Sequence, residues 1–463
     1  MPSKLCPLSD LQGGGQIKRP KWAKSDDQTQ MGKDATNCGA GNPERRFRYE
    51  AVSAPYRSAS TLARGWTVSK IDELGRVVEV RQYAGPDLPI PWNGNSANTI
   101  TGTRTTVYQA DWVTGTDEAG RRKRSASDGY GRMVEVVEDP AVNPGDKGYL
   151  TSYEYDANDN LTKVSQAGTI MGNTRVRNFE YTSLGRLKRA QNPESGAIDY
   201  TYDNGGNVLT KADSRVSMSM GAYDALGRPT SKSYGAGTPP VSYIYDSCVG
   251  GKGRLCGVTT AGGGNDQTSV AMEYDLMGRL VKRTQSVGGI SHIVTQSYLL
   301  NGLVREIVYP TSTVSLPRKV IYEYWPNGQM KEAWQGAVGT GLRYARYEDY
   351  QAGGTAQSVM LGNSVVENSQ ANERGQMVSR SWTKDAVNFH ALSFGYGSQN
   401  NGNLRTQGIS GLHLGVGFNF QQGFDYDSIN RLRIFQDSGM SGCGSVAARQ
   451  QYVFDRYGCA ARA

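Results

Sequence analysis

The stretch Asp199-Tyr-Thr-Tyr-Asp-Asn-Gly-Gly-Asn-Val-Leu-Thr-Lys211 decides the fold of this chain. Tyr200 and Tyr202 are two residues apart, so in an extended strand their side chains project from the same face. Asp203 can then accept a backbone N–H two residues on, which starts a turn, and Gly206 supplies the positive φ that closes a four-residue loop. An apolar run restarts directly after the turn. The stretch therefore predicts a β-hairpin that carries its own turn.

This hairpin pattern is a repeat, because 14 copies of it can be counted between Ile71 and Leu432. From Tyr155 to Tyr324 successive tyrosines are 26, 21, 21, 22, 29, 24 and 26 residues apart. A lone hairpin is marginally stable in water, so the units must stack side by side to bury their tyrosines and leucines. We therefore predict an all-β fold, an array of stacked antiparallel β-hairpins that forms one long curved or spiralling sheet.

The pattern assigns structural roles at the repeat turns to a set of tyrosines, aspartates, glycines and arginines. They are Tyr155, Asp156, Tyr181, Gly185, Arg186, Tyr202, Asp203, Gly206, Tyr223, Asp224, Gly227, Arg228, Tyr274, Asp275, Gly278, Arg279, Tyr426, Asp427 and Arg431.

Four segments differ in how well they keep the repeat. Residues 1–45 are polar and glycine-rich without an apolar h-region, so we expect them to be poorly ordered and not to act as a secretory signal peptide. Residues 46–150 hold degenerate repeats and loops, residues 151–458 hold the repeat array, and residues 459–463 form a short non-repeat tail. Repeat arrays need end units with polar outer faces, and none is recognisable after the last repeat. We therefore expect a truncated or fragmentary member of a longer architecture.

The Tyr-Asp-x-x-Gly-Arg-Leu signature resembles the tyrosine-aspartate (YD) repeat of the bacterial rearrangement-hotspot (RHS) proteins. It is clearest at Tyr274–Leu280 and Tyr223–Arg228, and the resemblance covers roughly residues 65 to 458. Related repeats build the shells of insecticidal toxin-complex proteins and of teneurins. The resemblance implies a non-enzymatic YD-repeat β-shell whose wall encloses a C-terminal toxin or effector. It also implies a polypeptide cargo or the rest of the shell as partner, and a secreted or cell-surface location.

The release chemistry of the family does not carry over to this chain. In the family, a closing domain has a motif around Asp-Pro-x-Gly-Leu, and aspartates there release the toxin by self-cleavage. Here Asp139-Pro140 is followed by Ala141 instead of a glycine–leucine pair. Neither autoproteolysis nor toxin activity is therefore assigned to any residue, and we expect the effector to be absent.

Aromatic side chains leave a second function open, an extracellular carbohydrate-binding or adhesion array with a cell-surface glycan as its partner. Packing between neighbouring hairpins is the competing use of the same side chains. The aromatic residues in question are the tyrosines together with Trp112, Trp325, Trp334 and Trp382.

The sequence offers few groups for catalysis or metal binding. Its three histidines, His292, His390 and His413, have no cysteine or carboxylate neighbour at ligand spacing. Asp156–Asn160 matches the first half of a calcium loop, but Leu161 stands where that loop needs glycine. We therefore expect a repeat turn at Asp156, and no catalytic residue, metal or cofactor anywhere in the chain.

The distribution of charge along the chain indicates which classes of partner it does not favour. The net charge of +8, from 51 basic and 43 acidic residues, is spread along the chain and favours anionic partners only slightly. Arg121–Arg124 is the densest basic run, for which a solvated strand face is the expectation and a polyanion contact the alternative. We expect no nucleic-acid partner and, since no 18-residue apolar run occurs, no membrane span.

The six cysteines show neither zinc-ligand spacing nor a C-x-x-C pair. Two of them, Cys248 and Cys256, bracket an inserted turn after Asp246. A disulfide across this loop, formed in an oxidising compartment, and two free thiols both stay open.

Overall fold

The computed structural model of the protein contains strands and no helix among the residues that it describes. This confirms the predicted all-β class. Of the predicted N-terminal segment 1–45, only strand β1 (Asp27–Met31) lies within the described residues. The described residues are 27–31, 47–54, 65–85, 87–89, 98–138, 148–167, 174–235, 237–260, 262, 267–310, 318–413, 415–437, 449–454 and 460–462.

The chain forms two compact units, which are described separately. We call Tyr149–Arg346 the central unit, and we call Met1–Gly148 together with Tyr347–Ala463 the terminal unit.

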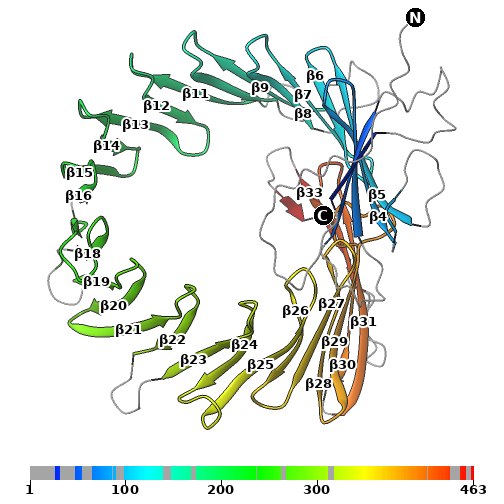
Figure 1. Cartoon of the computed structure of the whole chain (residues 1–463). Helices are drawn as coiled ribbons and strands as arrows, with labels where there is room; N and C mark the ends of the chain where they lie inside the picture. The colour runs from blue at the N-terminus through cyan, green and yellow to red at the C-terminus, as the bar shows by residue number, and fades with distance from the viewer. Residues whose placement is uncertain are drawn as a thin grey trace, which may run out of the picture. The chain divides into compact units, whose positions relative to one another are not determined.

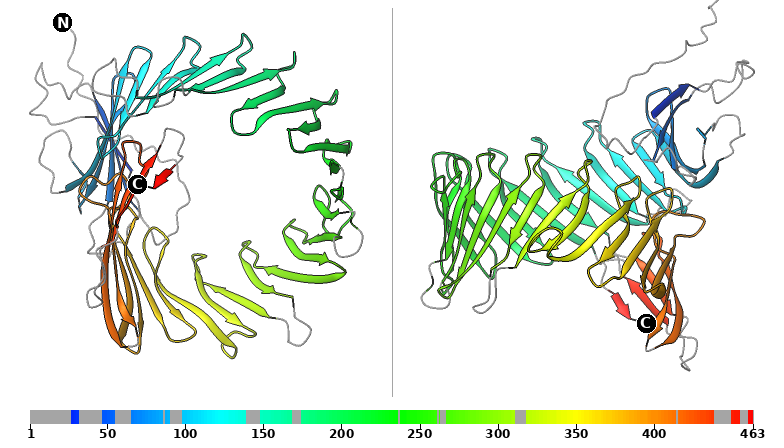
Figure 2. Two further views of the ribbon diagram at one scale, coloured as in Figure 1. Left: turned by 180° about the vertical axis from the view of Figure 1, so that it is seen from behind. Right: turned by 60° about the horizontal axis from the view of Figure 1, so that its bottom comes forward.

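The central unit is an uninterrupted series of antiparallel neighbours, in which every strand pairs with the next one along the chain. Its strands follow a curved path (Figures 1 and 2), as predicted for stacked hairpins. They are β9 (Tyr149–Tyr155), β10 (Leu161–Gln166), β11 (Arg175–Tyr181), β12 (Leu187–Asn192), β13 (Gly196–Tyr202), β14 (Val208–Ala212), β15 (Ser217–Tyr223), β16 (Pro229–Tyr234), β17 (Val241–Tyr245), β18 (Leu255–Thr260), β19 (Thr268–Tyr274), β20 (Leu280–Val287), β21 (Ile290–Tyr298), β22 (Val304–Val308), β23 (Lys319–Tyr324), β24 (Met330–Gln335) and the start of β25 (Leu342–Tyr350).

The terminal unit contains two such series. In both, consecutive strands pair antiparallel, from β1 to β8 and from β26 to β34. Besides β1 and the end of β25, its strands are β2 (Arg48–Ser53), β3 (Gly65–Ile71), β4 (Val77–Ala84), β5 (Thr99–Gln109), β6 (Trp112–Thr116), β7 (Arg122–Ser127), β8 (Met133–Glu138), β26 (Ala356–Leu361), β27 (Val366–Ala371), β28 (Met377–Lys384), β29 (Val387–Gly395), β30 (Thr406–His413), β31 (Val416–Tyr426), β32 (Leu432–Asp437), β33 (Arg449–Phe454) and β34 (Ala460–Arg462).

Burial is uneven between the two units. In the terminal unit, Tyr49, Ala51, Trp66, Val68 and Tyr83 form one buried apolar cluster on β2, β3 and β4. Most described side chains of the central unit are only half-buried. Since burial of apolar surface is the main stabilising contribution to folding, the central unit needs other links between its hairpins. Its buried apolar side chains are Ala190, Cys256, Val320, Ala333 and Trp334.

Candidate functional site

Most repeat turns close in the same way over five residues, as Asp224–Arg228 illustrates. The backbone N–H of Asp224 donates to the carbonyl of Arg228 at 3.0 Å, and the N–H of Gly227 donates to the carbonyl of Asp224 at 2.9 Å. The Asp224 carboxylate accepts the N–H groups of Leu226 and Arg228, both at 2.9 Å. The aspartate therefore caps the loop that the glycine closes. The same pair of backbone hydrogen bonds closes the turns that begin at Asp72, Asp117, Asp128, Asp156, Thr182, Asp203, Asp275, Leu299, Trp325, Gln351, Leu361, Asn372 and Asp427.

The fourth residue of the loop takes the left-handed conformation, for which glycine is the usual choice. Asp159 (φ 65°) and Asn430 (φ 69°) take this place in two of the turns, and aspartate and asparagine are the residues that tolerate it best after glycine. The predicted glycines and their φ values are Gly185 at 73°, Gly206 at 93°, Gly227 at 73° and Gly278 at 78°.

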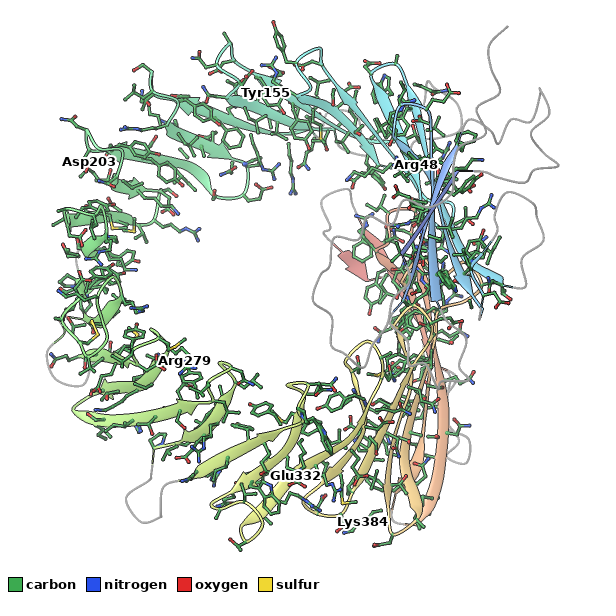
Figure 3. The ribbon with its side chains drawn as sticks, in the orientation of Figure 1. Arg48, Tyr155, Asp203, Arg279, Glu332 and Lys384 are labelled. Carbon is green, nitrogen blue, oxygen red and sulfur yellow. A yellow bond between two sulfur atoms is a disulfide. The ribbon has the colours of Figure 1, made fainter. Side chains whose placement is uncertain are left out.

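The arginine that ends the loop pairs with the aspartate that starts it. The Nε of Arg228 lies 2.6 Å from Asp224 Oδ2, and the Nε of Arg279 lies 2.7 Å from Asp275 Oδ2. Figure 3 labels Arg279 and, on another hairpin, Asp203. The same pair forms at Asp427 and Arg431, whereas asparagine replaces the arginine after Asp156 and Asp203.

In many repeats a tyrosine precedes the turn and reaches back to the preceding hairpin. Its hydroxyl donates to the backbone carbonyl of the first residue after the preceding turn, for example from Tyr202 to Leu187 at 2.7 Å and from Tyr223 to Val208 at 2.6 Å. We call this series the tyrosine ladder. Its other members are Tyr108 to Val77, Tyr181 to Leu161, Tyr245 to Pro229, Tyr274 to Leu255, Tyr298 to Leu280, Tyr324 to Val304, Tyr396 to Met377 and Tyr426 to Leu404.

The loop arginine extends the link in the other direction, toward the next hairpin. Arg186 donates to the carbonyl of Asp203 at 3.0 Å, and Arg279 donates to the carbonyl of Leu299 at 2.9 Å. Arg279 also lies over the ring of Tyr298, 4.6 Å from its centroid. The turns Thr182–Arg186 and Asp275–Arg279 are thus tied to both of their neighbours, so these predicted turn residues also connect one hairpin to the next. Tyr155, the first of the predicted set, ends β9 opposite Leu161.

These contacts shift the pKa values of the turn groups. The backbone N–H of Arg228 is the largest cause that lowers the pKa of the Asp224 carboxyl, and the Arg228 guanidinium adds to it. The backbone N–H of Arg279 lowers the pKa of Asp275 in the same way. Desolvation, followed by the nearby Asp203 charge, raises the pKa of the Tyr223 hydroxyl.

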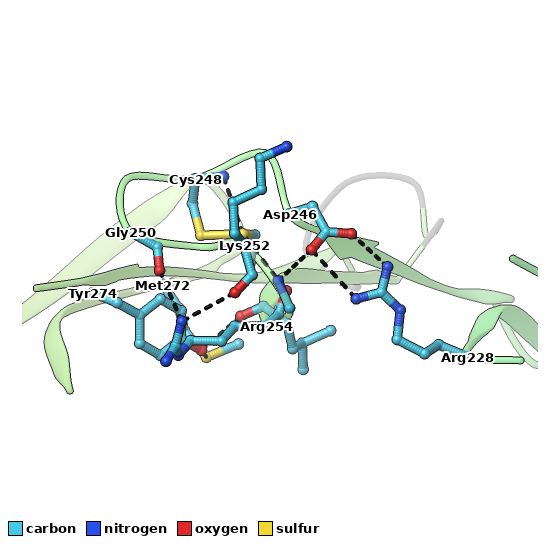
Figure 4. Close-up of a disulfide and its surroundings, with 11 residues drawn as sticks. Arg228, Asp246, Cys248, Gly250, Lys252, Arg254, Met272 and Tyr274 are labelled. Atoms are coloured by element: carbon cyan, nitrogen blue, oxygen red, sulfur yellow. Dashed lines mark hydrogen bonds and ion pairs between the residues drawn. A yellow bond between two sulfur atoms is a disulfide. The ribbon is translucent and has the colours of Figure 1, made fainter. Parts of the chain in front are cut away.

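The inserted turn after Tyr245 holds a disulfide between Cys248 and Cys256, whose Cα atoms are 5.4 Å apart (Figure 4). Asp246 accepts the N–H of Gly253 at 2.6 Å and is also paired with Arg228 of the preceding turn. The insertion therefore keeps the link between repeats although its loop is longer. Cys6, Cys38, Cys443 and Cys459 lie outside the described residues.

His390 and the calcium-like segment at Asp156 make contacts of the fold itself. The ring of His390 lies 5.2 Å from Trp382 and 6.2 Å from Phe418, whereas His292 is exposed on β21. Asp156 accepts N–H groups of its own turn. Within the described part of the chain, three or more metal-ligating side chains do not gather anywhere, and no helix is long and apolar enough to cross a membrane.

Tryptophans named as glycan-stacking candidates are engaged by neighbouring side chains. The indole N–H of Trp334 donates to Glu332, and that of Trp382 donates to Glu367, both at 3.0 Å. Trp334 is also only 9% exposed. These contacts favour the packing use over the glycan surface.

The terminal unit contains one arrangement that the sequence pattern did not reveal. The turn Asp117–Arg121 contacts turns of the C-terminal series, and we call these contacts the seam. Asn401 donates to Asp117 Oδ2 at 2.9 Å, and Arg121 donates to Asn430 Oδ1 at 2.7 Å and to the carbonyl of Tyr426 at 3.2 Å. Tyr426 directly precedes a repeat turn. Arg121 therefore donates to a backbone carbonyl beside another turn, as Arg186 and Arg279 do, but its partner is more than 300 residues away.

A second ion pair belongs to the seam. Arg374 lies 3.3 Å from the buried carboxylate of Glu118 and also donates to the carbonyl of Asn400. Burial raises the pKa of Asp117, but hydrogen bonds from Asn401 and from backbone N–H groups outweigh it and lower the pKa overall.

The basic run Arg121–Arg124 differs from the expected solvated strand face. Only Lys123 is exposed, and the other three side chains are half-buried. Arg124 lies over the ring of Trp112, 4.4 Å from its centroid. The run therefore contributes to packing and to the seam as well as to the surface.

A repeat turn that the sequence reading missed lies at Gln351–Thr355. The signal was present, because Tyr350 precedes the turn and Gly354 stands at its fourth position, but the turn begins with glutamine instead of aspartate. Fold and contacts together define a repeat array of antiparallel hairpins joined by the tyrosine ladder.

No protein-family model and no curated protein match the chain. Among solved structures it is similar to a TcdB2–TccC3–TEV complex, with 11% identity and a TM-score of 0.41 over 88% of this chain. It is also similar to the Photorhabdus luminescens Tc holotoxin pore, with 12% identity and a TM-score of 0.43 over 90% of this chain. The chain spans 27% of the length of each of these matched chains.

Proposed function

We propose that the chain is a non-enzymatic wall segment of an RHS/YD-repeat shell that holds a polypeptide cargo, and that it acts outside the cell or at its surface. The observation that carries this proposal is the tyrosine ladder. A wall must keep its shape while both of its faces stay accessible, and the ladder links hairpins through turns and strand ends instead of through a thick core.

The burial pattern supports the same role. Most described side chains of the central unit are half-buried, and alternating strand positions face opposite sides of the sheet. Among the described residues of the central unit, all strands belong to a single sheet and no helix lies on it. A sheet of this kind presents a large surface to a bound polypeptide, while the turn contacts along its edge maintain its curvature.

Protease protection of a tethered polypeptide tests the proposal. A disordered polypeptide with one protease site is fused after Ala463, and its cleavage rate is compared with that of the same polypeptide free in solution. We expect cleavage about tenfold slower in the fusion, because a held cargo is cleaved only from its transiently released form.

The matched control is the same fusion with Gly227→Val, which disturbs one turn of the wall. Protection should fall in this variant. Equal cleavage rates for the free polypeptide and the wild-type fusion would contradict the cargo-holding role.

A further inference from the structure

We propose that a hollow in the terminal unit binds a small molecule that carries two or more oxyanion groups, such as phosphate or sulfate esters. The hollow has a volume of about 510 Å³ and lies between strands β4 to β8 and the turn at Asp427–Arg431. This lies within the range of about 300–1,000 Å³ that small-molecule sites occupy. The inference is independent of cargo holding, since it concerns the terminal unit alone.

The register of the strands shows which residues form the floor of the hollow. Thr106 lies opposite Gly115, Gly115 lies opposite Lys123, and Lys123 lies opposite Glu138. Directly opposed residues of antiparallel strands share a face, and Arg104 joins this face because it is two residues from Thr106. Two cationic side chains therefore stand on one face, on either side of a glycine.

Gly115 opens the space between them. A Cβ atom built at this position would meet a single atom, the carbonyl oxygen of Lys123 at 3.9 Å, which is ordinary contact distance. The backbone here is compatible with any residue, since its φ is outside the left-handed region. The missing side chain, and not a strained backbone, thus creates the hollow.

Cationic side chains outnumber carboxylates in the lining of the hollow. Arg104, Arg121, Arg122 and Lys123 line it together with Asp117 and Glu138. Arg104 is paired with the buried carboxylate of Glu118 at 3.7 Å, so Arg122 and Lys123 carry most of the excess positive charge. The Asp117 carboxylate accepts hydrogen bonds from Asn401 and from two backbone N–H groups of its own turn. Its charge is thus partly compensated within the seam, whereas the Lys123 ammonium group is exposed.

The rim comes from the far end of the chain. Ser428, Ile429 and Asn430 complete the lining, and Arg121 holds this turn in place through Asn430 and the carbonyl of Tyr426. Threonine and serine hydroxyl groups around the hollow are neutral donors. Charged donors beside neutral ones are the combination that binds phosphate and sulfate oxygens in proteins. The hydroxyl residues are Thr105, Thr106, Thr116 and Ser428.

Calorimetric titration of the full chain with inorganic pyrophosphate and with a sulfated disaccharide tests the site. We expect saturable binding of at least one probe, weakened by added salt. Lys123→Gln should weaken it about tenfold, since a charge-assisted contact is lost. Gly115→Val places a branched side chain on the floor between the two strands that carry Arg104 and Lys123, so it should weaken binding about tenfold while the melting temperature stays at or above the wild-type value.

Lys188→Gln is the matched control, because Lys188 is also an exposed lysine at the second position of a strand that follows a repeat turn. It should change the affinity less than twofold. Saturable binding of pyrophosphate alone would identify the ligand as a phosphate ester. Saturable binding of the disaccharide alone would identify it as a sulfate ester. The proposal would be overturned if neither probe saturated the protein, or if Lys123→Gln and Lys188→Gln had equal effects. Wild-type affinity in a folded Gly115→Val variant would overturn it as well.

Discussion

The central and terminal units use the same repeat turn but link their hairpins over different distances along the chain. In the central unit, the ladder bond from Tyr202 to Leu187 spans 15 residues. In the terminal unit, the seam bond from Arg121 to Asn430 spans 309 residues. The chemistry is nearly the same in both places, since an arginine or tyrosine of one turn donates to a carbonyl or amide oxygen of another.

The two kinds of contact differ in how much of the chain must be folded before they can form. A ladder bond needs two consecutive hairpins, so its loop-closure entropy is small. A seam bond needs both ends of the chain in place, and contacts of such sequence separation form slowly. We therefore expect damage in the central unit to stay confined to the affected repeat, and damage to a few seam residues to affect the terminal unit as a whole.

The largest loss of stability is expected from a substitution at Gly65, which approaches Glu373, the neighbour of the seam residue Arg374. A Cβ atom there would lie 2.1 Å from the backbone oxygen of Glu373, and neither backbone can yield easily. Gly65→Ala should therefore cost about 3 kcal/mol of unfolding free energy, measured by urea denaturation. Gly115→Ala is the control within the same unit, because its Cβ would meet nothing closer than 3.9 Å. Equal losses in the two variants would contradict the close approach of Gly65 to Glu373.

A smaller loss of stability is expected from a substitution in one turn of the central unit. Gly227 has φ 73°, and the nearest atom to a Cβ built there is Asn207 Oδ1 at 3.4 Å. Gly227→Val therefore acts through backbone strain, which costs about 1–3 kcal/mol. Arg228→Ala leaves the backbone of the turn intact and should lower the melting temperature less. Equal, small losses in both variants would contradict the hairpin turn.

Removal of a single hydrogen bond of the tyrosine ladder should cause the next largest loss of stability. Tyr223→Phe removes the hydroxyl that donates to Val208 at 2.6 Å and should cost about 1 kcal/mol. Tyr200→Phe is the matched control on β13, two strands away, where the tyrosine contacts Lys211 through its ring instead. Thermal unfolding measures both changes. A loss for Tyr200→Phe as large as that for Tyr223→Phe would show that the ladder bond contributes nothing specific.

The sequence predicted the all-β class and the turn chemistry because both are local. Tyr202, Asp203 and Gly206 act within a few residues of one another, and their spacing determines the loop. The turn at Gln351 was missed because glutamine replaces the capping aspartate, although its backbone closes in the same way.

The links between hairpins were less accessible to sequence reading. The tyrosines were assigned to packing, whereas their hydroxyl groups select one carbonyl on the preceding hairpin, which depends on the register between hairpins. The seam was not predictable, since the turn at Asp117 carries nothing that distinguishes Asn430 from other turn residues. Its partner is set by the path of the whole terminal unit.

The smallest expected effect is a pH dependence at a single turn. The folded pKa of Asp224 lies below its ordinary value because the Arg228 N–H and guanidinium favour the carboxylate, and the unfolded value is about 3.9. The stabilisation is therefore present above about pH 3.9 and is lost as the pH falls through the folded pKa. Asp224→Asn should lower the melting temperature at pH 6, and the difference from wild type should shrink on acidification.

The turn at Thr182 allows the reciprocal experiment. There a hydroxyl accepts the N–H of Arg186 at 3.2 Å, where other turns have a carboxylate. Thr182→Asp supplies the missing charge beside an arginine, so it should raise the melting temperature at pH 6 and lose that gain in acid. Opposite shifts that both fade with falling pH would show that the carboxylate stabilises the turn as an ion. Shifts that do not depend on pH would instead assign the stabilisation to the hydrogen bonds of the loop alone.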